Sequence, residues 1–132
     1  MGWKAADPVS LEFVERDPRD GEAHGRQVAD LTAALELRES RARLWRYPPH
    51  TTGRRHADKA QEEVFIVLSG ALTMLLGDPP ERIDLGAGGV VAVAPGTPLQ
   101  VRNESDDELV LYIYGAPPEQ AGADFFDDVA LP

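Results

Sequence analysis

Residues 56–70 read HADKAQEEVFIVLSG, and this stretch decides the fold. From Glu62 onward it alternates, so that an extended chain places Glu63, Phe65 and Val67 on one face. The opposite face carries three further apolar side chains, and a Ser-Gly pair then ends the run in a tight turn. An extended segment that is apolar on both faces is typical of a strand covered on both sides. The stretch therefore predicts a buried strand in a sandwich or a barrel.

Short apolar runs like this one recur along the rest of the chain. They are residues 42–47, 71–76, 82–85, 90–94, 99–102 and 108–114. Clusters of Gly, Pro, Asn, Ser and Asp separate them, which is the all-β pattern of a sandwich, jelly roll or small barrel. A further strand is expected within Val9–Glu15. Residues 31–40 fit either a short amphipathic helix or a strand with a bulge, and we favour the strand.

The composition indicates one globular domain with an acidic surface. The 132 residues include 13 basic and 23 acidic side chains, which gives a formal net charge of -10. Such a charge repels phosphate backbones, so we expect no nucleic acid and no anionic membrane as partners. The basic residues crowd into residues 38–55, where a local site for a small anion remains compatible with the overall charge.

Cysteine is absent, which excludes disulfides and thiolate metal sites. No apolar run approaches the roughly 18 residues that span a bilayer, and the first residues, MGWKAADP, lack the apolar core of a signal peptide. We therefore expect a cytoplasmic protein.

The spacing within the opening stretch resembles the first signature of the cupin family. That signature has a glycine, five residues, His-x-His, three or four residues, Glu, six residues and Gly. In this chain His50 stands at the leading glycine, His56 at the first histidine and Asp58 at the second. Glu63 and Gly70 match the glutamate and the closing glycine.

A second cupin signature is similar to GGVVAVAPGTPLQVRN, residues 88–103. The family has Gly, five residues, Pro-x-Gly, two residues, His, three residues and Asn. Gly88, Gly96 and Asn103 match, whereas Ala94 replaces the proline and Leu99 replaces the histidine. The positions that build turns are kept, and some positions that would bind a metal are replaced.

The resemblance implies an all-β fold, a double-stranded β-helix or jelly-roll barrel, over residues 31–115. Residues 1–30 would form an N-terminal arm and residues 116–132 a short C-terminal tail. The tail contains Phe125, Phe126 and two further large apolar residues. We therefore expect it to dock on its own barrel or on a partner subunit.

In cupins three histidines and the glutamate bind a divalent ion such as Fe, Mn, Zn or Ni inside the barrel. The resemblance thus implies an altered metal set of His56, Asp58 and Glu63, since Leu99 has no ligand atom. His50 is a further candidate, because an even spacing from His56 suits one strand face, although two prolines precede it.

The loss of a histidine ligand favours an organic ligand over a tightly held ion. Glu63 and His56 would be its polar anchors, and the guanidinium of Arg54 could hold a carboxylate or a phosphate. The apolar lining expected for the barrel is Phe65, Val67, Met74, Val91, Leu99 and Val101.

Several of these residues also have plainer interpretations. His56 could be a hydrogen-bonded core histidine, and Asp58 could be a turn residue. Arg54 and Arg55 are expected as a surface charge pair in that reading. The other arginines of the basic segment, Arg38, Arg41, Arg43 and Arg46, are expected mostly at a solvent-facing sheet edge.

Three hypotheses for the function follow. The first is a cupin that binds a small organic molecule without a robust metal centre. The second is a metal-dependent enzyme of the isomerase, dioxygenase or decarboxylase type with the altered site. The third is an interaction module. All three include a homodimer, since the apolar outer residues Val64, Ile66 and Leu68 require cover.

Overall fold

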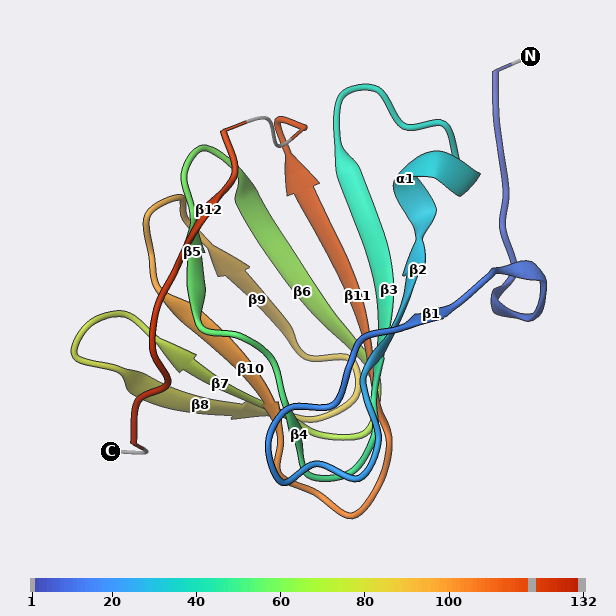
Figure 1. The fold of residues 1–132 in the computed structure, drawn as a ribbon. Coiled ribbons are helices and arrows are strands. Elements are labelled where there is room, and N and C mark those ends of the chain that lie inside the picture. The colour runs from blue at the N-terminus through green and yellow to red at the C-terminus, as the bar shows by residue number, and fades with distance from the viewer. Residues whose placement is uncertain (1, 119–120, 131–132) are drawn as a thin grey trace.

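The structure is a computed structural model that describes residues 2–118 and 121–130. Two antiparallel sheets face each other across its core (Figure 1). The first sheet contains, in spatial order, β1 (Val14–Glu15), β2 (Gln27–Asp30), β3 (Arg41–Tyr47), β11 (Leu109–Ala116), β6 (Glu62–Ser69) and β9 (Val90–Val93). The second contains β12 (Ala123–Phe125), β5 (His56–Asp58), β10 (Leu99–Asn103), β7 (Leu72–Leu76) and β8 (Glu81–Leu85), and β4 (Thr51–Thr52) also pairs with β10. The all-β prediction is confirmed.

The expected strand at residues 31–40 is wrong. Residues Leu31–Ala34 form one turn of α-helix, α1, because the side chain of Asp30 caps its start by accepting from the amide of Ala33 at 3.3 Å. Leu35, at the C-terminal end of α1, still has a helical conformation. The apolar side chains of this segment pack on the outer face of the first sheet. Local capping thus outweighs the strand-like pattern.

The strand expected within Val9–Glu15 is much shorter than predicted. Residues Pro8–Ser10 form a 3₁₀ turn, η1, whose start is capped by Asp7, and only Val14–Glu15 pair as a strand. Proline has no amide to donate to a sheet, which accounts for the turn at this position. No helix in residues 2–118 and 121–130 has the length and apolarity needed to cross a membrane.

The main core lies between the two sheets and follows the period of two along each strand. In β6 the side chains of Glu63, Phe65 and Val67 are buried, as the sequence predicts, with exposed fractions of 5%, 2% and 1%. From the facing sheet, Leu72 and Met74 of β7 are completely buried. A second apolar cluster covers the outer face of β3 with side chains from the arm and α1.

Two of the turn positions carry specific structural tasks. Gly70 has a φ of 82°, and a Cβ there would collide with the carbonyl oxygen of Glu108. Asn103 is 1% exposed, and its Nδ2 donates to the carbonyls of Tyr47, Pro48 and Asp107 at 3.0, 3.1 and 2.8 Å. These two residues hold the chain reversals at one end of the barrel.

The C-terminal tail docks on its own barrel. β12 pairs with β5, so the red segment in Figure 1 runs beside the green strand. Farther along, Asp128 accepts two hydrogen bonds of 2.9 Å from Nη2 of Arg19 and one of 2.9 Å from Gln100. The tail is therefore fixed to both the N-terminal arm and the second sheet.

Candidate functional site

A cavity of about 590 Å³ lies between the sheets at the end where the tail crosses. Its apolar wall consists of Trp45, Tyr47, Phe65, Leu99, Val101 and Ile113. These residues come from four strands of the two sheets, β3, β6, β10 and β11, and each faces inward because of the alternation along its strand. The polar groups of the cavity gather at specific places on this wall.

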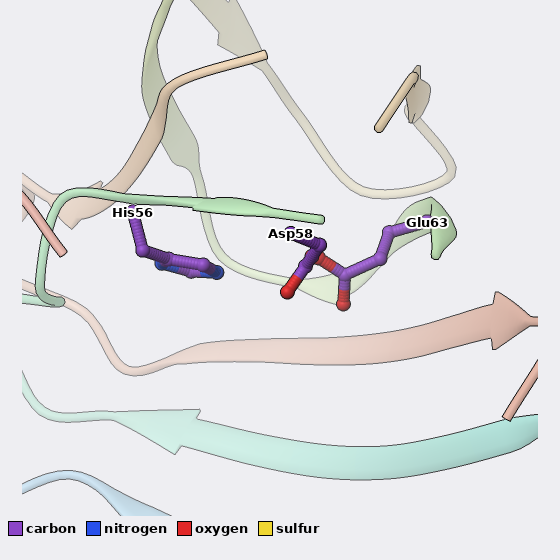
Figure 2. Close-up of side chains that lie close together, drawn as sticks. All are labelled: His56, Asp58 and Glu63. Atoms are coloured by element: carbon purple, nitrogen blue, oxygen red, sulfur yellow. The ribbon is translucent and has the colours of Figure 1, made fainter. Parts of the chain in front are cut away.

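His56, Asp58 and Glu63 form the main polar cluster (Figure 2). One potential ligand atom from each residue lies within 4.8 Å of the others. His56 and Asp58 are alternate residues of β5 and therefore project to the same side, while Glu63 reaches them from β6. The structure thus brings together the three residues that the resemblance implied as a metal set.

The backbone orients the imidazole of His56. Its Nδ1 lies 3.0 Å from the carbonyl oxygen of Arg54, which can only accept a hydrogen bond. With Nδ1 carrying the proton, Nε2 keeps its lone pair for a ligand or an ion. The ring of Phe125 lies beside it, with the ring centres 5.9 Å apart.

Glu63 is a titratable group of the site whose pKa is strongly shifted. Burial, together with the hydrogen bond and the negative charge of Asp58, raises its pKa to about 9, and Arg43 and Arg41 oppose this effect. Its Oε1 is buried and has no hydrogen-bond partner within the described chain. Despite these arginines, a pKa of about 9 means that Glu63 keeps its proton at neutral pH unless a metal ion binds beside it.

The three side chains fit a divalent ion. Donor atoms about 2.0 to 2.3 Å from one ion lie up to about 4.6 Å apart, close to the observed spread. The buried Oε1 of Glu63 supplies an oxygen that nothing else in the described residues satisfies. Leu99 lies opposite His56 in the sheet and closes the position where a fourth protein ligand would stand.

His50 does not join the cluster. It lies outside the cavity lining, its side chain is 60% exposed, and its Nε2 pairs with Asp106 at 2.7 Å. Its φ of 56° is in the left-handed region that favours glycine, the residue of the cupin signature at this position. The continuous strand that would have carried His50 to the metal set is absent between the described residues 47 and 51.

Most residues expected to contact an organic ligand do line the cavity. Besides the polar cluster, Arg54, Phe65 and Leu99 are among them. Met74 is not: it is completely buried in the core between the sheets and does not reach the cavity surface. The expected lining residues Val67 and Val91 likewise lie outside the lining.

The placement expected for the arginines of β3 is wrong for two of them. Arg41 and Arg43 line the cavity instead of a solvent-facing edge, whereas Arg46 faces outward and stacks on Phe13 at 4.0 Å. The alternation in residues 41–47, RARLWRY, indicates this placement, because it puts Arg41, Arg43 and Trp45 on one face of the strand. Arg16 and Arg26 from the arm also line the cavity, and the sequence carries no comparable signal for them.

The expected surface charge pair is wrong for Arg55, which is buried, whereas Arg54 is exposed. Arg54 lines the cavity, and its guanidinium stacks on Phe125 at 4.0 Å. Arg55 is only 8% exposed, lies over Phe126 at 5.1 Å and reaches the carbonyl of Gly77. Aromatic residues of the tail therefore contact both guanidinium groups, and residues 122, 123 and 125 of the tail form one wall of the cavity.

The sequence matches one family model, that of the cupin domain, over residues 43–114. This match covers more than half of the chain and includes both signatures, with His50 inside the matched range. No curated protein sequence matches the chain.

Many solved structures share the fold. The polyketide cyclase RemF from Streptomyces resistomycificus superimposes with a TM-score of 0.77 at 14% identity, covering 96% of this chain and 87% of that one. A sugar phosphate isomerase from Silicibacter pomeroyi gives 0.74 at 20% identity, covering 97% and 95%. An uncharacterized double-stranded β-helix protein from Klebsiella pneumoniae gives 0.68 at 20% identity, covering 85% and 90%. At these identities the likeness establishes the fold alone.

Proposed function

The chain belongs to the cupin family, and on that premise we propose that it binds a small organic molecule in the cavity between its two sheets. The observation that carries this proposal is the cavity of about 590 Å³, which combines an apolar wall with one cluster of titratable side chains. Ligand pockets are typically about 300 to 1,000 Å³ and largely apolar, with a few polar groups that fix orientation. His56, Asp58 and Glu63 would supply that orientation.

The position of Leu99 supports an organic ligand over a tightly held ion. This side chain is 1% exposed, lines the cavity and lies beside His56, where the family has a histidine. A leucine there adds apolar contact area and removes a donor atom. The cavity floor next to the polar cluster is thus suited to a hydrocarbon or a ring.

A second candidate function is that of a metal-dependent enzyme, of the isomerase, dioxygenase or decarboxylase type. It is favoured by the unpartnered Oε1 of Glu63 and by the three ligand atoms within 4.8 Å. Structural relatives of this chain include a sugar phosphate isomerase and a polyketide cyclase. A divalent ion held by His56, Asp58 and Glu63 would act as a Lewis acid toward an oxygen of the bound molecule.

Elemental analysis of the purified protein separates the two functions. The first predicts well below one equivalent of Fe, Mn, Zn or Ni per chain. The matched variants are Glu63→Gln, which removes a carboxylate from the cluster, and Glu62→Gln, the exposed neighbour on the other face of β6. One equivalent of metal in the wild type and in Glu62→Gln, but not in Glu63→Gln, would establish the second function and overturn the first.

Binding itself can be measured with an uncharged probe, N-phenyl-1-naphthylamine. The chain has two tryptophans, and only Trp45 lines the cavity, so Trp3→Phe leaves one reporter. We expect saturable quenching of Trp45 as the probe binds. Ala123→Phe, which fills the cavity beside the tail, should abolish it, whereas Ala60→Phe on an exposed turn should not. Absence of saturable quenching, or equal quenching in both variants, would contradict the proposal.

A further inference from the structure

Five guanidinium groups surround the cavity, those of Arg16, Arg26, Arg41, Arg43 and Arg54. Among residues 2–118 and 121–130, the acidic residues in the lining are Asp58 and Glu63. This excess of positive charge is opposite in sign to the net charge of -10 carried by the chain. The cavity therefore differs electrostatically from the rest of the molecule.

These arginines have no ion-pair partners among residues 2–118 and 121–130. The salt bridges of the described chain involve other cations, among them Arg19, Arg82 and Arg102. Arg43 shows the electrostatic repulsion that results. Burial and the nearby charges of Arg41 and Arg16 lower its pKa, while Glu63 and Asp58 have the opposite effect. Like charges held together in a half-buried place destabilise the fold unless an anion joins them.

Arg26 adds an independent observation. Its guanidinium lies over the rings of Trp45 and Tyr47, at 5.3 and 5.5 Å from their centres, and its Nη1 is 3.5 Å from the Tyr47 hydroxyl. Its Nε is buried and has no hydrogen-bond partner in the described chain. A buried donor without an acceptor costs free energy that a bound acceptor would recover.

Three of the five arginines lie where the cavity meets a second hollow. That hollow of about 680 Å³, between the N-terminal arm, α1 and β3, is also lined by Arg16, Arg41 and Arg43. The two hollows adjoin at these three side chains. A charged group held there would leave the rest of a ligand to extend along the apolar wall toward Phe65 and Leu99.

We infer that the ligand of the cavity is a small organic anion, with a carboxylate or phosphate group held by Arg41 and Arg43 and an apolar body against the aromatic wall. This inference rests on the proposed function and narrows its ligand class. Guanidinium groups bind both anions through paired hydrogen bonds, and the aromatic rings of Trp45 and Phe65 supply contact area for the body. Arg26 and Arg16 would add to the field that attracts the anion.

The test compares two probes with the same apolar body. 8-Anilinonaphthalene-1-sulfonate carries an anionic group, and N-phenyl-1-naphthylamine does not. With Trp3→Phe as the background, we expect the anionic probe to bind about tenfold more tightly, and Arg43→Met to weaken it by about tenfold, as for loss of one charged hydrogen-bond donor. The neutral probe should change less than about twofold in the same variant.

Arg46→Met is the matched control, because Arg46 lies on the same strand but faces outward. It should leave both probes unaffected. If Arg43→Met fails to fold by circular dichroism, Arg41→Met serves with the same expectations. Equal affinity for the two probes, or an equal loss for both in the variant, would overturn the inference while leaving organic-ligand binding intact. Failure of both probes to bind would overturn the proposed function as well.

Competition distinguishes the two anionic groups. Benzoate, phenyl phosphate and uncharged benzamide would be titrated against the bound anionic probe. Displacement by benzoate or phenyl phosphate, but not by benzamide, supports the inference, and the more effective anion identifies the preferred group. Displacement by benzamide at the same concentration, or by none of the three, contradicts it.

Discussion

Leu99 lies directly opposite His56 across the pairing of β10 with β5. An aliphatic side chain that is 1% exposed thus occupies the place beside the imidazole where a second nitrogen donor would complete the cluster. This neighbour relationship limits His56, Asp58 and Glu63 to three protein donors.

Leu99→His should convert the three-donor cluster into a four-donor metal site. Each added imidazole strengthens the binding of borderline divalent ions, so we expect the affinity for Zn²⁺ or Ni²⁺ to rise by at least about tenfold, roughly 1.4 kcal/mol. Isothermal titration calorimetry would measure it. In the double variant with Glu63→Gln, this increase in metal affinity should disappear. An affinity unchanged from that of the wild type would show that position 99 does not face the cluster.

Glu63→Gln should change the pH dependence of stability. The pKa of Glu63 is raised from its ordinary value of 4.5 to about 9, so the folded chain holds a proton between these values that the unfolded chain has lost. The stabilisation that this proton gives the folded wild type is therefore fully present below about pH 4.5. The free energy of unfolding then falls as the pH rises toward 9. Glutamine cannot lose a proton, so the variant should gain at least about 1 kcal/mol relative to the wild type between pH 5 and 9.

Urea unfolding with a chelator present would measure this difference, since a bound cation would favour the ionised carboxylate. Glu62→Gln is the control, because that side chain is exposed on the opposite face of β6. A constant free-energy difference between wild type and Glu63→Gln across this range would show that Glu63 ionises normally in the folded chain.

Gly70→Ala should destabilise the barrel more than Gly88→Ala. Both glycines have positive φ, 82° and 85°, so both variants carry the cost of a left-handed alanine, about 1 kcal/mol. Only at Gly70 would the new Cβ also collide with the backbone of Glu108, whereas nothing lies within 4 Å at Gly88. We expect a loss above about 2 kcal/mol for Gly70→Ala in thermal unfolding. Equal losses would refute a role for the close approach.

We propose that a second copy of the chain covers the outer face of β6, β9 and β11. Leu68, Val90 and Tyr114 are 51%, 57% and 40% exposed there, and the strand register places Ile66 between Val90 and Tyr112. Apolar residues on three adjacent strands suit a two-fold interface. Sedimentation should show a dimer at micromolar concentration that Val90→Glu dissociates. Val9→Glu, at an exposed valine of η1, should not dissociate it, and a monomeric wild type would rule the interface out.

Much of the barrel was readable from the sequence because strand periodicity and turn residues act locally. The alternation from Glu62 placed Glu63, Phe65 and Val67 inward, as observed. The signature glycine and asparagine positions likewise mark real chain reversals. For residues 31–40 the sequence left a helix and a strand open, and the favoured strand is wrong because a single capping aspartate decides between two similar patterns.

The candidate site was only partly readable. The convergence of His56, Asp58 and Glu63 followed from the family spacing and is observed. Charge alone predicts a solvent-facing position for the arginines of β3, whereas the alternation along the strand places Arg41 and Arg43 on the same face as Trp45, as observed. The contribution of Arg16 and the tail depends on contacts between distant segments, which no local pattern encodes.

β3 serves two different interiors at once. Its odd-numbered residues Arg41, Arg43 and Trp45 line the cavity, while Ala42 and Leu44 lie in the apolar cluster beneath the arm. A one-residue shift in the register of this strand would exchange the two sets, placing guanidinium groups in the apolar cluster and aliphatic side chains in the cavity. Substitutions at the odd-numbered positions of β3 can therefore change what the cavity accepts while the opposite face of the strand keeps its packing.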